Sequence, residues 1–353
     1  MGLTSLPPSF CHLTTLEALY LVDCFELWEL PEGFCRLTAL KALCITGAER
    51  LQLPEDDGAY AILEDHRLYG SADFLPDSIA QLPSLTSLEL DCCYPVWLPR
   101  RIRPSSLLQL TGLKRVKITG CRSLSEVPAS LDTLVGLKSF ELTDCEELDN
   151  LPAGLPPSLE TLCLGAFKEG SSHVVDISQL SQLRVLKLNC VGVQGGPAVS
   201  SRLLCLQQLE QLEMRLAGNS QQLPLPPAFL PRLRSLLIAV PGIRRLWENL
   251  AAAMPELRQL ELLSWSRKEL PRSILEHTSL TSLTINAPRL VALPQGMSRL
   301  SQLRKLELIC CNAMQHLPER LTQLRQLILR ETSIRSLPAN FVQLIPDSTG
   351  EDD

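Results

Sequence analysis

The chain has 353 residues, 45% of them hydrophobic, and carries a formal net charge of −6 at pH 7. This acidic balance argues against a dedicated nucleic-acid-binding protein, which would present a basic surface. No apolar run is long enough for a membrane-spanning helix, and the opening Met1-Gly-Leu-Thr does not begin a secretory signal peptide. The composition therefore predicts a protein with an ample core, no nucleic-acid partner and no membrane insertion.

The string Leu-x-x-Leu-x-Leu recurs along the chain about once every two dozen residues. Self-similarity at this period predicts a solenoid of stacked repeats, because one repeat cannot bury its leucines alone. Solenoids form long surfaces that bind other molecules. The first leucines of the strings are Leu16, Leu40, Leu85, Leu113, Leu137, Leu159, Leu183, Leu209, Leu233, Leu257, Leu280, Leu303 and Leu324.

The repeat that begins at Leu137 shows the local structure we expect. We number each repeat from its first leucine, so Leu137 is position 1 and Cys145 is position 9. Phe140 and Leu142 stand two residues apart, as a strand with one buried face requires. Pro152 has no amide hydrogen for a sheet ladder, so Leu151-Pro152 should start the return path on the convex side. Return segments such as residues 34–37 should form short helical turns.

The full string L-x-x-L-x-L-x-x-C-x-x-L-x-x-L-P resembles the leucine-rich repeat family over nearly the whole chain. In detail it is similar to the repeats of plant intracellular immune receptors and related cytosolic proteins. The resemblance implies an α/β solenoid, a horseshoe with a parallel concave sheet and short helices or turns on the convex side. Position 9 should be a narrow interior slot, which cysteine fits as a small apolar group with a weak donor. We assign to this slot Cys24, Cys93, Cys121, Cys145 and Cys311, and in irregular repeats Ala48, Val191, Pro241, Trp265 and Pro288.

The gap between Leu40 and Leu85 is nearly two periods long and predicts a degenerate repeat at 53–74. Its strand would begin at Leu63 and carry His66 in place of the middle leucine. The alternative is an acidic loop. With this repeat we expect one domain at 1–345 of about 14 repeats, followed by an acidic disordered tail at 346–353. Both ends fall within a repeat, which indicates a fragment, a degenerate cap or an end-to-end contact.

The chain contains 13 cysteines, most of them at core or strand positions of the repeat. Buried thiols in an odd number favour a reducing compartment, the cytoplasm or the nucleus. No asparagine lies in an N-x-Ser/Thr glycosylation sequence, which points the same way. The adjacent pairs 92–93 and 310–311 should point to opposite faces of their strands, so we expect no metal site.

Two charged columns are expected on the concave face, to which the residues between the leucines point. Position 2 is basic in eight of 14 repeats, and position 5 is glutamate in five. Opposite charges on neighbouring strands stabilise a sheet by roughly 0.2–1 kcal/mol each, so the columns can be a solvated face of local ion pairs. The basic column is Lys41, Lys114, Lys138, Arg184, Arg234, Arg258, Arg304 and Arg325, and the acidic column is Glu89, Glu141, Glu213, Glu261 and Glu307.

The alternative is that breaks in these columns mark partner-binding patches. A basic patch would gather around a strand without glutamate and could meet an acidic segment of a partner: Lys114, Arg115, Lys117 and Lys138, with Arg100, Arg101 and Arg103 just before. An apolar patch with charged edges is a plausible protein contact. It would comprise Leu216, Leu237, Val240, Leu263, Ile309 and Ile328, with Trp265 close by.

The sequence contains no motif of a known catalytic site. The segment 165–172 lacks the lysine of a phosphate-binding loop, and G-x-S-x-G, H-E-x-x-H and C-x-x-C are all absent. We therefore expect no catalytic residues, no cofactor and no metal. The resemblance implies protein–protein recognition, as the ligand-sensing or autoinhibitory part of an intracellular plant-type immune receptor.

Alternatives are a stand-alone scaffold for a small GTPase or ubiquitin-ligase component, or a pathogen effector, since residues 151–159 resemble the short repeats of bacterial effector ligases. An enzyme is the remotest alternative. The sequence leaves the ligand, the organism and the oligomeric state open.

Overall fold

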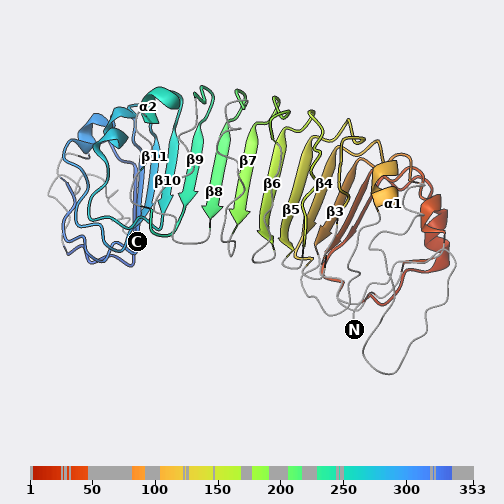
Figure 1. The fold of residues 1–353 in the computed structure, drawn as a ribbon. Coiled ribbons are helices and arrows are strands. Elements are labelled where there is room, and N and C mark those ends of the chain that lie inside the picture. The colour runs from red at the N-terminus through yellow and green to blue at the C-terminus, as the bar shows by residue number, and fades with distance from the viewer. Residues whose placement is uncertain are drawn as a thin grey trace, which may run out of the picture. The chain divides into compact units, whose positions relative to one another are not determined.

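The computed structural model shows thirteen β-strands that follow one another in chain order in a single sheet (Figure 1). It describes residues 3–24, 27, 30–31, 33–46, 82–91, 104–121, 124, 127–145, 148–167, 177–190, 206–216, 229–243, 246, 250–318, 321 and 323–335. The strands are β1 (Ala18–Leu21), β2 (Ala42–Thr46), β3 (Ser87–Asp91), β4 (Arg115–Thr119), β5 (Ser139–Cys145), β6 (Thr161–Phe167), β7 (Val185–Cys190), β8 (Gln211–Leu216), β9 (Ser235–Ala239), β10 (Gln259–Leu263), β11 (Ser282–Asn286), β12 (Lys305–Ile309) and β13 (Gln326–Arg330).

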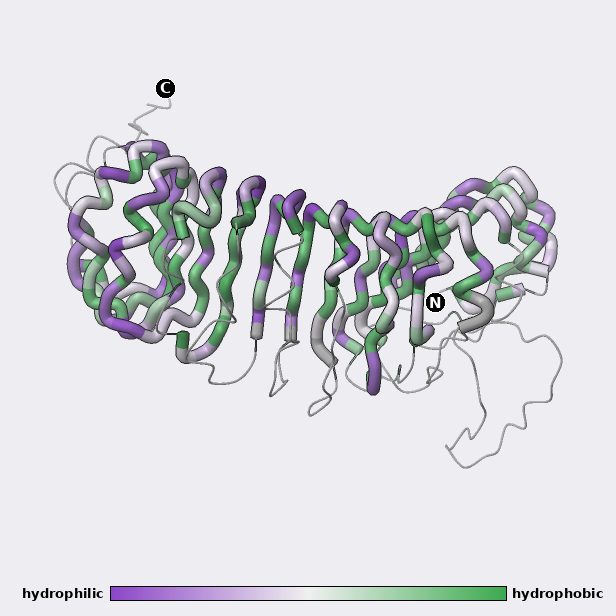
Figure 2. The backbone as a smooth tube through the Cα atoms, turned by 45° about the horizontal axis from the view of Figure 1, so that its top comes forward, coloured by the Kyte–Doolittle hydropathy of each residue, from purple (hydrophilic) through white to green (hydrophobic). Residues whose placement is uncertain are grey.

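The leucines of the repeat form the core, as the period-two pattern predicts. In β5, Phe140 and Leu142 are buried while Glu141 between them is half-buried on the other face. Neighbouring strands are parallel and keep the repeat in register, so Phe140 lies opposite Val116 on β4. Figure 2 shows hydrophobic residues running along the strands and hydrophilic ones mostly at the bends. Each repeat therefore covers the apolar face of the next, and the predicted α/β solenoid with a parallel sheet is confirmed.

The chain divides into two compact units. The first comprises residues 1–183 and 189–199, and the second residues 184–188 and 200–353. Strands β1 to β6 belong to the first unit and β8 to β13 to the second, whereas β7 contributes to both. Within each unit, neighbouring described strands are parallel and pair residues one repeat apart, for example Glu89 with Lys117 and Glu307 with Ile328.

Short helices form the return segments between strands. The segment that begins at Phe34 makes a 3-10 turn, as expected, and Gly33 before it has φ 82°, a left-handed conformation that glycine adopts without strain. The described helices are η1 (Pro8–His12), η2 (Phe34–Arg36), α1 (Pro104–Gln109), α2 (Leu250–Ala253), η5 (Arg272–Glu276) and η6 (Met297–Arg299).

Position 9 is the narrow interior slot that the sequence predicts. Cys121, Cys145 and Cys311 are completely buried, and each thiol donates a hydrogen bond to the carbonyl two residues earlier. Position 8 before the slot has positive φ, 57° at Asp144, so a left-handed residue turns the chain inward. Trp265 also fills its slot, with 1% of its surface exposed, and donates its indole hydrogen to the Glu269 carbonyl at 3.1 Å.

Two of the predicted slot residues, Pro241 and Pro288, are wrong because both prolines are exposed. Val240 and Ala287 occupy the slot instead, each with 0% exposure. These two repeats have one residue fewer between strand and slot, and the left-handed residue is the one that is missing.

The degenerate repeat predicted at 53–74 lies outside the described residues, as do the end of the predicted domain at 345 and the acidic segment 346–353. The described strands on either side of this repeat pair directly, Ala42 with Ser87 and Leu43 with Leu88.

Candidate partner-binding face

The face of the sheet turned away from the leucine core is built from positions 3, 5 and 7 of each strand. In β5 these are Ser139, Glu141 and Thr143, all half-buried. We call this surface the open face. Position 2, just before each strand, borders it, and we call the row of position-2 residues the position-2 edge. Side chains on the open face come from rigid, hydrogen-bonded strands about 4.8 Å apart, so their spacing is fixed by the backbone.

In the first unit, ion pairs join neighbouring strands along a single repeat position. Lys41 Nζ lies 2.6 Å from Glu17 Oε1, and Lys138 Nζ lies 2.7 Å from Glu160 Oε1, all four at position 2. Each cation thus meets a glutamate of the adjacent repeat. These pairs are exposed, so each adds little stability, about 0–1 kcal/mol.

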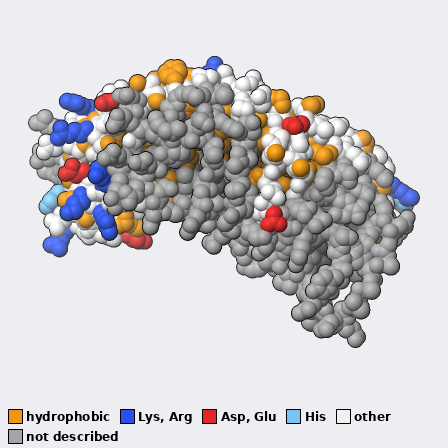
Figure 3. All heavy atoms as spheres, in the orientation of Figure 1, with side chains coloured by type: hydrophobic (Ala, Val, Ile, Leu, Met, Phe, Trp, Pro, Cys, Tyr) orange, Lys and Arg blue, Asp and Glu red, His pale blue; other side chains and the backbone are white. Residues whose placement is uncertain are grey.

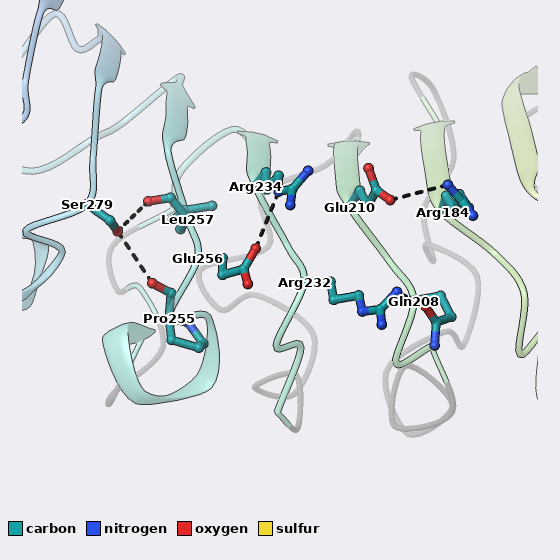
Figure 4. A network of polar contacts seen from close by, with 9 residues as sticks. All are labelled: Arg184, Gln208, Glu210, Arg232, Arg234, Pro255, Glu256, Leu257 and Ser279. Atoms are coloured by element: carbon teal, nitrogen blue, oxygen red, sulfur yellow. Dashed lines mark hydrogen bonds and ion pairs between the residues drawn. The ribbon is translucent and has the colours of Figure 1, made fainter.

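The second unit continues this pattern at its start. Arg184 Nη1 lies 3.6 Å from Glu210 Oε1 at position 2, and Lys187 Nζ lies 3.9 Å from Glu213 Oε2 at position 5. Figure 4 shows the position-2 edge here, with Arg184 directed toward Glu210 and Arg234 toward Glu256. Glutamate partners therefore accompany the cations along this part of the edge.

Local ion pairs occur on this face among the described residues, but they do not join the basic position-2 column to the acidic position-5 column. None of the salt bridges of these residues joins a position-2 cation to a position-5 glutamate. The register explains this, because it places equal positions of neighbouring strands opposite one another, as with Glu89 and Lys117. Pairs such as Lys41–Glu17 therefore join equal positions of neighbouring strands, whereas Arg234–Glu256 and the two pairs of Glu307 join different positions.

Lys117 is the clearest case, and it changes the basic patch. Its Nζ lies 2.5 Å from Glu89 Oε1, and the hydrogen bond to Glu89 is the main cause that raises the pKa of Lys117. On the other side of Glu89, buried Cys44 has a pKa raised to about 11, first by burial and then by the Glu89 charge. The Lys117 ammonium is thus neutralised by the Glu89 carboxylate and is not a free charge for a partner.

The other members of the basic patch divide into two groups. Lys138 is paired with Glu160. Lys114 and Arg115 are exposed and form no ion pair with any residue that the structure describes. Arg100, Arg101 and Arg103 lie outside the described residues. Among the described residues of the patch, two of the four cations are thus already paired with glutamates of neighbouring repeats.

The predicted apolar patch does not form a continuous surface. Val240 and Trp265 lie in the interior slot, and Leu237 is only 9% exposed. The three that remain half-buried, Leu263, Ile309 and Ile328, are separated by polar residues, since Ile309 lies opposite Asn286 and Arg330, and Ile328 opposite Glu307. Leu216 ends β8, but its side chain is outside the described ones. The prediction of exposed apolar side chains is therefore wrong for Leu237 and Val240.

Three arginines of the basic column form a candidate site at the C-terminal part of the position-2 edge, which the two patches predicted from the sequence did not include. Arg258, Arg304 and Arg325 precede β10, β12 and β13, and no described carboxylate forms an ion pair with them. Figure 3 shows Lys and Arg side chains gathered at the end of the molecule formed by these repeats. The signal was a local charge count: residues 229–335 hold 16 Lys and Arg but only 8 Asp and Glu.

On the open face beside these arginines, Glu307 is the one buried carboxylate among the described residues, with 8% exposure. Lys305 Nζ lies 3.0 Å from one of its oxygens and Arg330 Nε lies 3.5 Å from the other. Two cations therefore pair with one carboxylate, so this group of three side chains has a net positive charge.

Groups that could carry chemistry are few in the described part of the chain. No cluster of three or more His, Cys, Asp or Glu side chains suited to a metal ion occurs there. Within the same residues, no helix is both long and apolar enough to span a membrane. His277 is buried with its Nε2 unpartnered, and burial lowers the pKa of its imidazole. It takes the place of a core leucine such as Leu300 one repeat later.

Comparison with known proteins supports the repeat architecture. Residues 1–247 match the family model of the leucine-rich repeat region. A probable disease resistance protein of Arabidopsis thaliana is 30% identical over 178 residues, which are 50% of this chain and 10% of that protein. The chain thus spans about a tenth of the length of this curated relative.

Two solved structures are similar in fold. A leucine-rich repeat protein of Leptospira interrogans has 22% identity and a TM-score of 0.53, with 95% of this chain and 89% of that chain covered. The functional domain of InlJ from Listeria monocytogenes has 16% identity and a TM-score of 0.59, with 92% and 65% covered. At these identities the likeness concerns the fold alone. From the match over residues 1–247 and the parallel sheet of stacked repeats, the chain belongs to the leucine-rich repeat family.

Proposed function

We propose that this chain recognises a protein partner through the open face of its sheet and the position-2 edge. The observation that carries the proposal is that each repeat buries its leucines on one face of the sheet and presents other side chains on the opposite face. Leucines such as Leu137 are fully buried in the core, whereas residues between them, such as Glu141 and Thr143, stand half-buried on the other face, in register with the neighbouring strand. A rigid surface of this kind binds with little loss of conformational entropy.

We further propose that it serves as the ligand-sensing or autoinhibitory part of an intracellular plant-type immune receptor, in the cytoplasm or nucleus. The support is the disease resistance relative, together with the repeat string that resembles plant intracellular receptors. The buried cysteines of the slot, such as Cys145, add support for a reducing compartment, because they serve as small apolar groups whose thiols bond to backbone carbonyls.

The surface can be tested by placing a photo-cross-linking residue at matched serines of one region. Ser282 lies on the open face in β11, and Ser298 lies exposed in η6 on the return path. In extracts of the source organism, cross-linking from position 282 to a discrete protein, but not from position 298, is the expected result. Equal or exclusive cross-linking from position 298 would contradict recognition through the open face.

The receptor role has a separate test, which is the sequence of the full-length transcript. The expected result is a nucleotide-binding domain encoded in the same reading frame, because such domains accompany these repeats in the receptors that the chain resembles. A reading frame without any such domain would reject the receptor role and leave protein recognition by a scaffold.

A further inference from the structure

We infer that the position-2 edge of β10 to β13 is a docking site for a short, extended acidic segment of a partner protein. The inference rests on the proposed function, because it names the chemistry of the partner for one part of the same surface. Four observations carry it: the local charge, the missing glutamates, the anchoring of Arg304 and the row of hydrogen-bond donors beside it.

The local charge is opposite to that of the rest of the chain. Residues 229–335 carry a net charge of +8, with 16 basic and 8 acidic residues, whereas the whole chain carries −6. The remaining residues therefore hold 17 basic and 31 acidic side chains, a net charge of −14. A field of this kind attracts an acidic ligand to the C-terminal repeats and repels it elsewhere.

The glutamate partners of the position-2 edge stop where the arginines accumulate. Lys41 and Arg184 each face a glutamate at position 2 of a neighbouring strand. From β9 to β13 the position-2 residues include no carboxylate, and among these described residues only Arg234 forms an ion pair, with Glu256. The position-2 residues there are Arg234, Arg258, Thr281, Arg304 and Arg325. The edge thus lacks its internal counter-charge over β10 to β13.

Arg304 is held in place before any ligand arrives. Its Nη1 donates to the Ser301 carbonyl at 3.1 Å and to the Gln323 carbonyl at 3.2 Å. Arg325 stands beside it, because the Arg325 amide donates to the Arg304 carbonyl at 2.8 Å. These bonds fix the Arg304 guanidinium and place the backbone of Arg325 on the adjacent strand, so two arginines stand side by side, and arginine binds carboxylates in a fork.

The row next to the arginines holds no carboxylate and is rich in donors. At position 3, Gln259 and Gln326 are exposed, and Ser282 and Lys305, on the two strands between them, are half-buried. Lys305 is paired with Glu307. Amide and hydroxyl groups can bond to the main chain of a bound segment. From β10 to β13 the edge spans about 14 Å, which an extended chain covers in roughly four to five residues at 3.3 Å each. A segment of that length with three or more carboxylates fits the edge.

A protein segment fits better than a nucleic acid. A polynucleotide longer than the edge would meet the acidic remainder of the chain, which holds a net charge of −14. On the open face next to the edge stands Glu261, which would repel a continuous phosphate backbone. A short acidic segment contacts only the arginines and glutamines.

The test is the binding of a fluorescein-labelled pentaglutamate peptide to the whole chain, measured by fluorescence anisotropy at low salt. The main variant is Arg258→Gln with Arg325→Gln, which removes two exposed cations; Arg304→Gln is a second variant. The matched control is Lys41→Gln with Arg184→Gln, which changes the net charge equally at paired position-2 sites. A pentaglutamine peptide and a uridine oligonucleotide of equal charge complete the set. Far-ultraviolet circular dichroism verifies that each variant is folded.

The expected result is binding of pentaglutamate, about tenfold weaker for the main variant and within twofold of wild type for the control. Equal weakening in both double variants would reduce the effect to bulk charge and overturn the inference. Tighter binding of the oligonucleotide, or no binding of pentaglutamate, would also overturn it. A partner that cross-links from position 282 but binds the Arg258→Gln, Arg325→Gln variant as tightly as the wild type would support recognition through the open face and overturn the acidic docking site.

Discussion

Lys117 Nζ on β4 lies 2.5 Å from Glu89 Oε1 on β3, and the two side chains are each about one third exposed. A lysine that the sequence assigned to a partner is thus already occupied by the neighbouring repeat. A double-mutant cycle with Lys117→Met and Glu89→Gln should give a coupling free energy of about 0.5–1 kcal/mol, because the pair is only partly desolvated. Urea unfolding of the four proteins measures it.

The coupling between these residues should shrink when the salt concentration rises from about 0.1 M to 1 M, since exposed charges are screened. The same cycle between Lys114 and Glu89 is the control and should give no coupling. A Lys117–Glu89 coupling of zero at both salt concentrations would mean that the pair is not formed in solution.

The thiol of Cys44 should be slow to react. Burial, and secondly the Glu89 carboxylate, raise its pKa to about 11 from an ordinary value of 9.0. At pH 8 this shift lowers the thiolate fraction on the order of 100-fold. Mass spectrometry after brief iodoacetamide treatment should therefore find Cys44 labelled far more slowly in the native chain than in the unfolded one. Glu89→Gln should accelerate the labelling without restoring the unfolded rate, because burial remains; equal native and unfolded rates would contradict the assignment.

His277 should make the chain less stable in mild acid. Burial lowers the pKa of its imidazole in the folded state from the ordinary 6.5. When the pH falls through that ordinary value, the unfolded chain takes up a proton that the folded chain does not, so the free energy of unfolding decreases. The stability is fully present above this range and declines between about pH 7 and the lower folded pKa.

His277→Leu should therefore raise the free energy of unfolding by about 1–3 kcal/mol, by removing a buried nitrogen without a partner, and flatten its pH dependence. Thermal unfolding at several pH values measures both effects. His316→Leu, at an exposed histidine, is the control. An unchanged slope with pH in His277→Leu would show that other groups cause the acid sensitivity.

Gly165 should not tolerate a methyl group. A Cβ there would lie 2.5 Å from Asn189 Cβ and 2.6 Å from the Asn189 carbonyl oxygen, so backbone would have to move. Gly165→Ala should cost about 1–3 kcal/mol by overpacking. Gly136→Ala, whose Cβ would meet its nearest neighbour at an ordinary 3.7 Å, should be nearly neutral. Equal unfolding midpoints in urea for the two variants would contradict this packing.

The strands, the core and the short return turns could be predicted from the sequence because each depends on local periodicity. Phe140 and Leu142, for example, are buried because residues two apart on a strand point to the same face. The slot assignments failed at Val240 and Ala287 because the left-handed residue before the slot has no fixed side-chain type. The prolines themselves were a signal against these two assignments. The residue in the slot donates its backbone amide hydrogen to the next strand, as Trp265 does to the Asn286 carbonyl, and a proline has no such hydrogen.

The candidate site was predicted less well because it depends on neighbours along a column rather than along the chain. Lys117 looks free in its own strand, and its partner Glu89 becomes visible only with the register. Conversely, Arg325 looks like Lys41, and only the absence of a described carboxylate beside it distinguishes the two. The net charge of −6 also conceals the basic C-terminal stretch, because it is the sum of that stretch and a more acidic remainder.

The central claim is that the open face of the sheet, and not the return path, binds the partner. The most direct measurement is the affinity of the cross-linked partner for two variants of equal size, Ser282→Trp on β11 and Ser298→Trp in η6, by isothermal titration calorimetry. Recognition through the open face predicts binding weakened about tenfold or more by Ser282→Trp and unchanged by Ser298→Trp. Binding that survives Ser282→Trp but is lost in Ser298→Trp would contradict it.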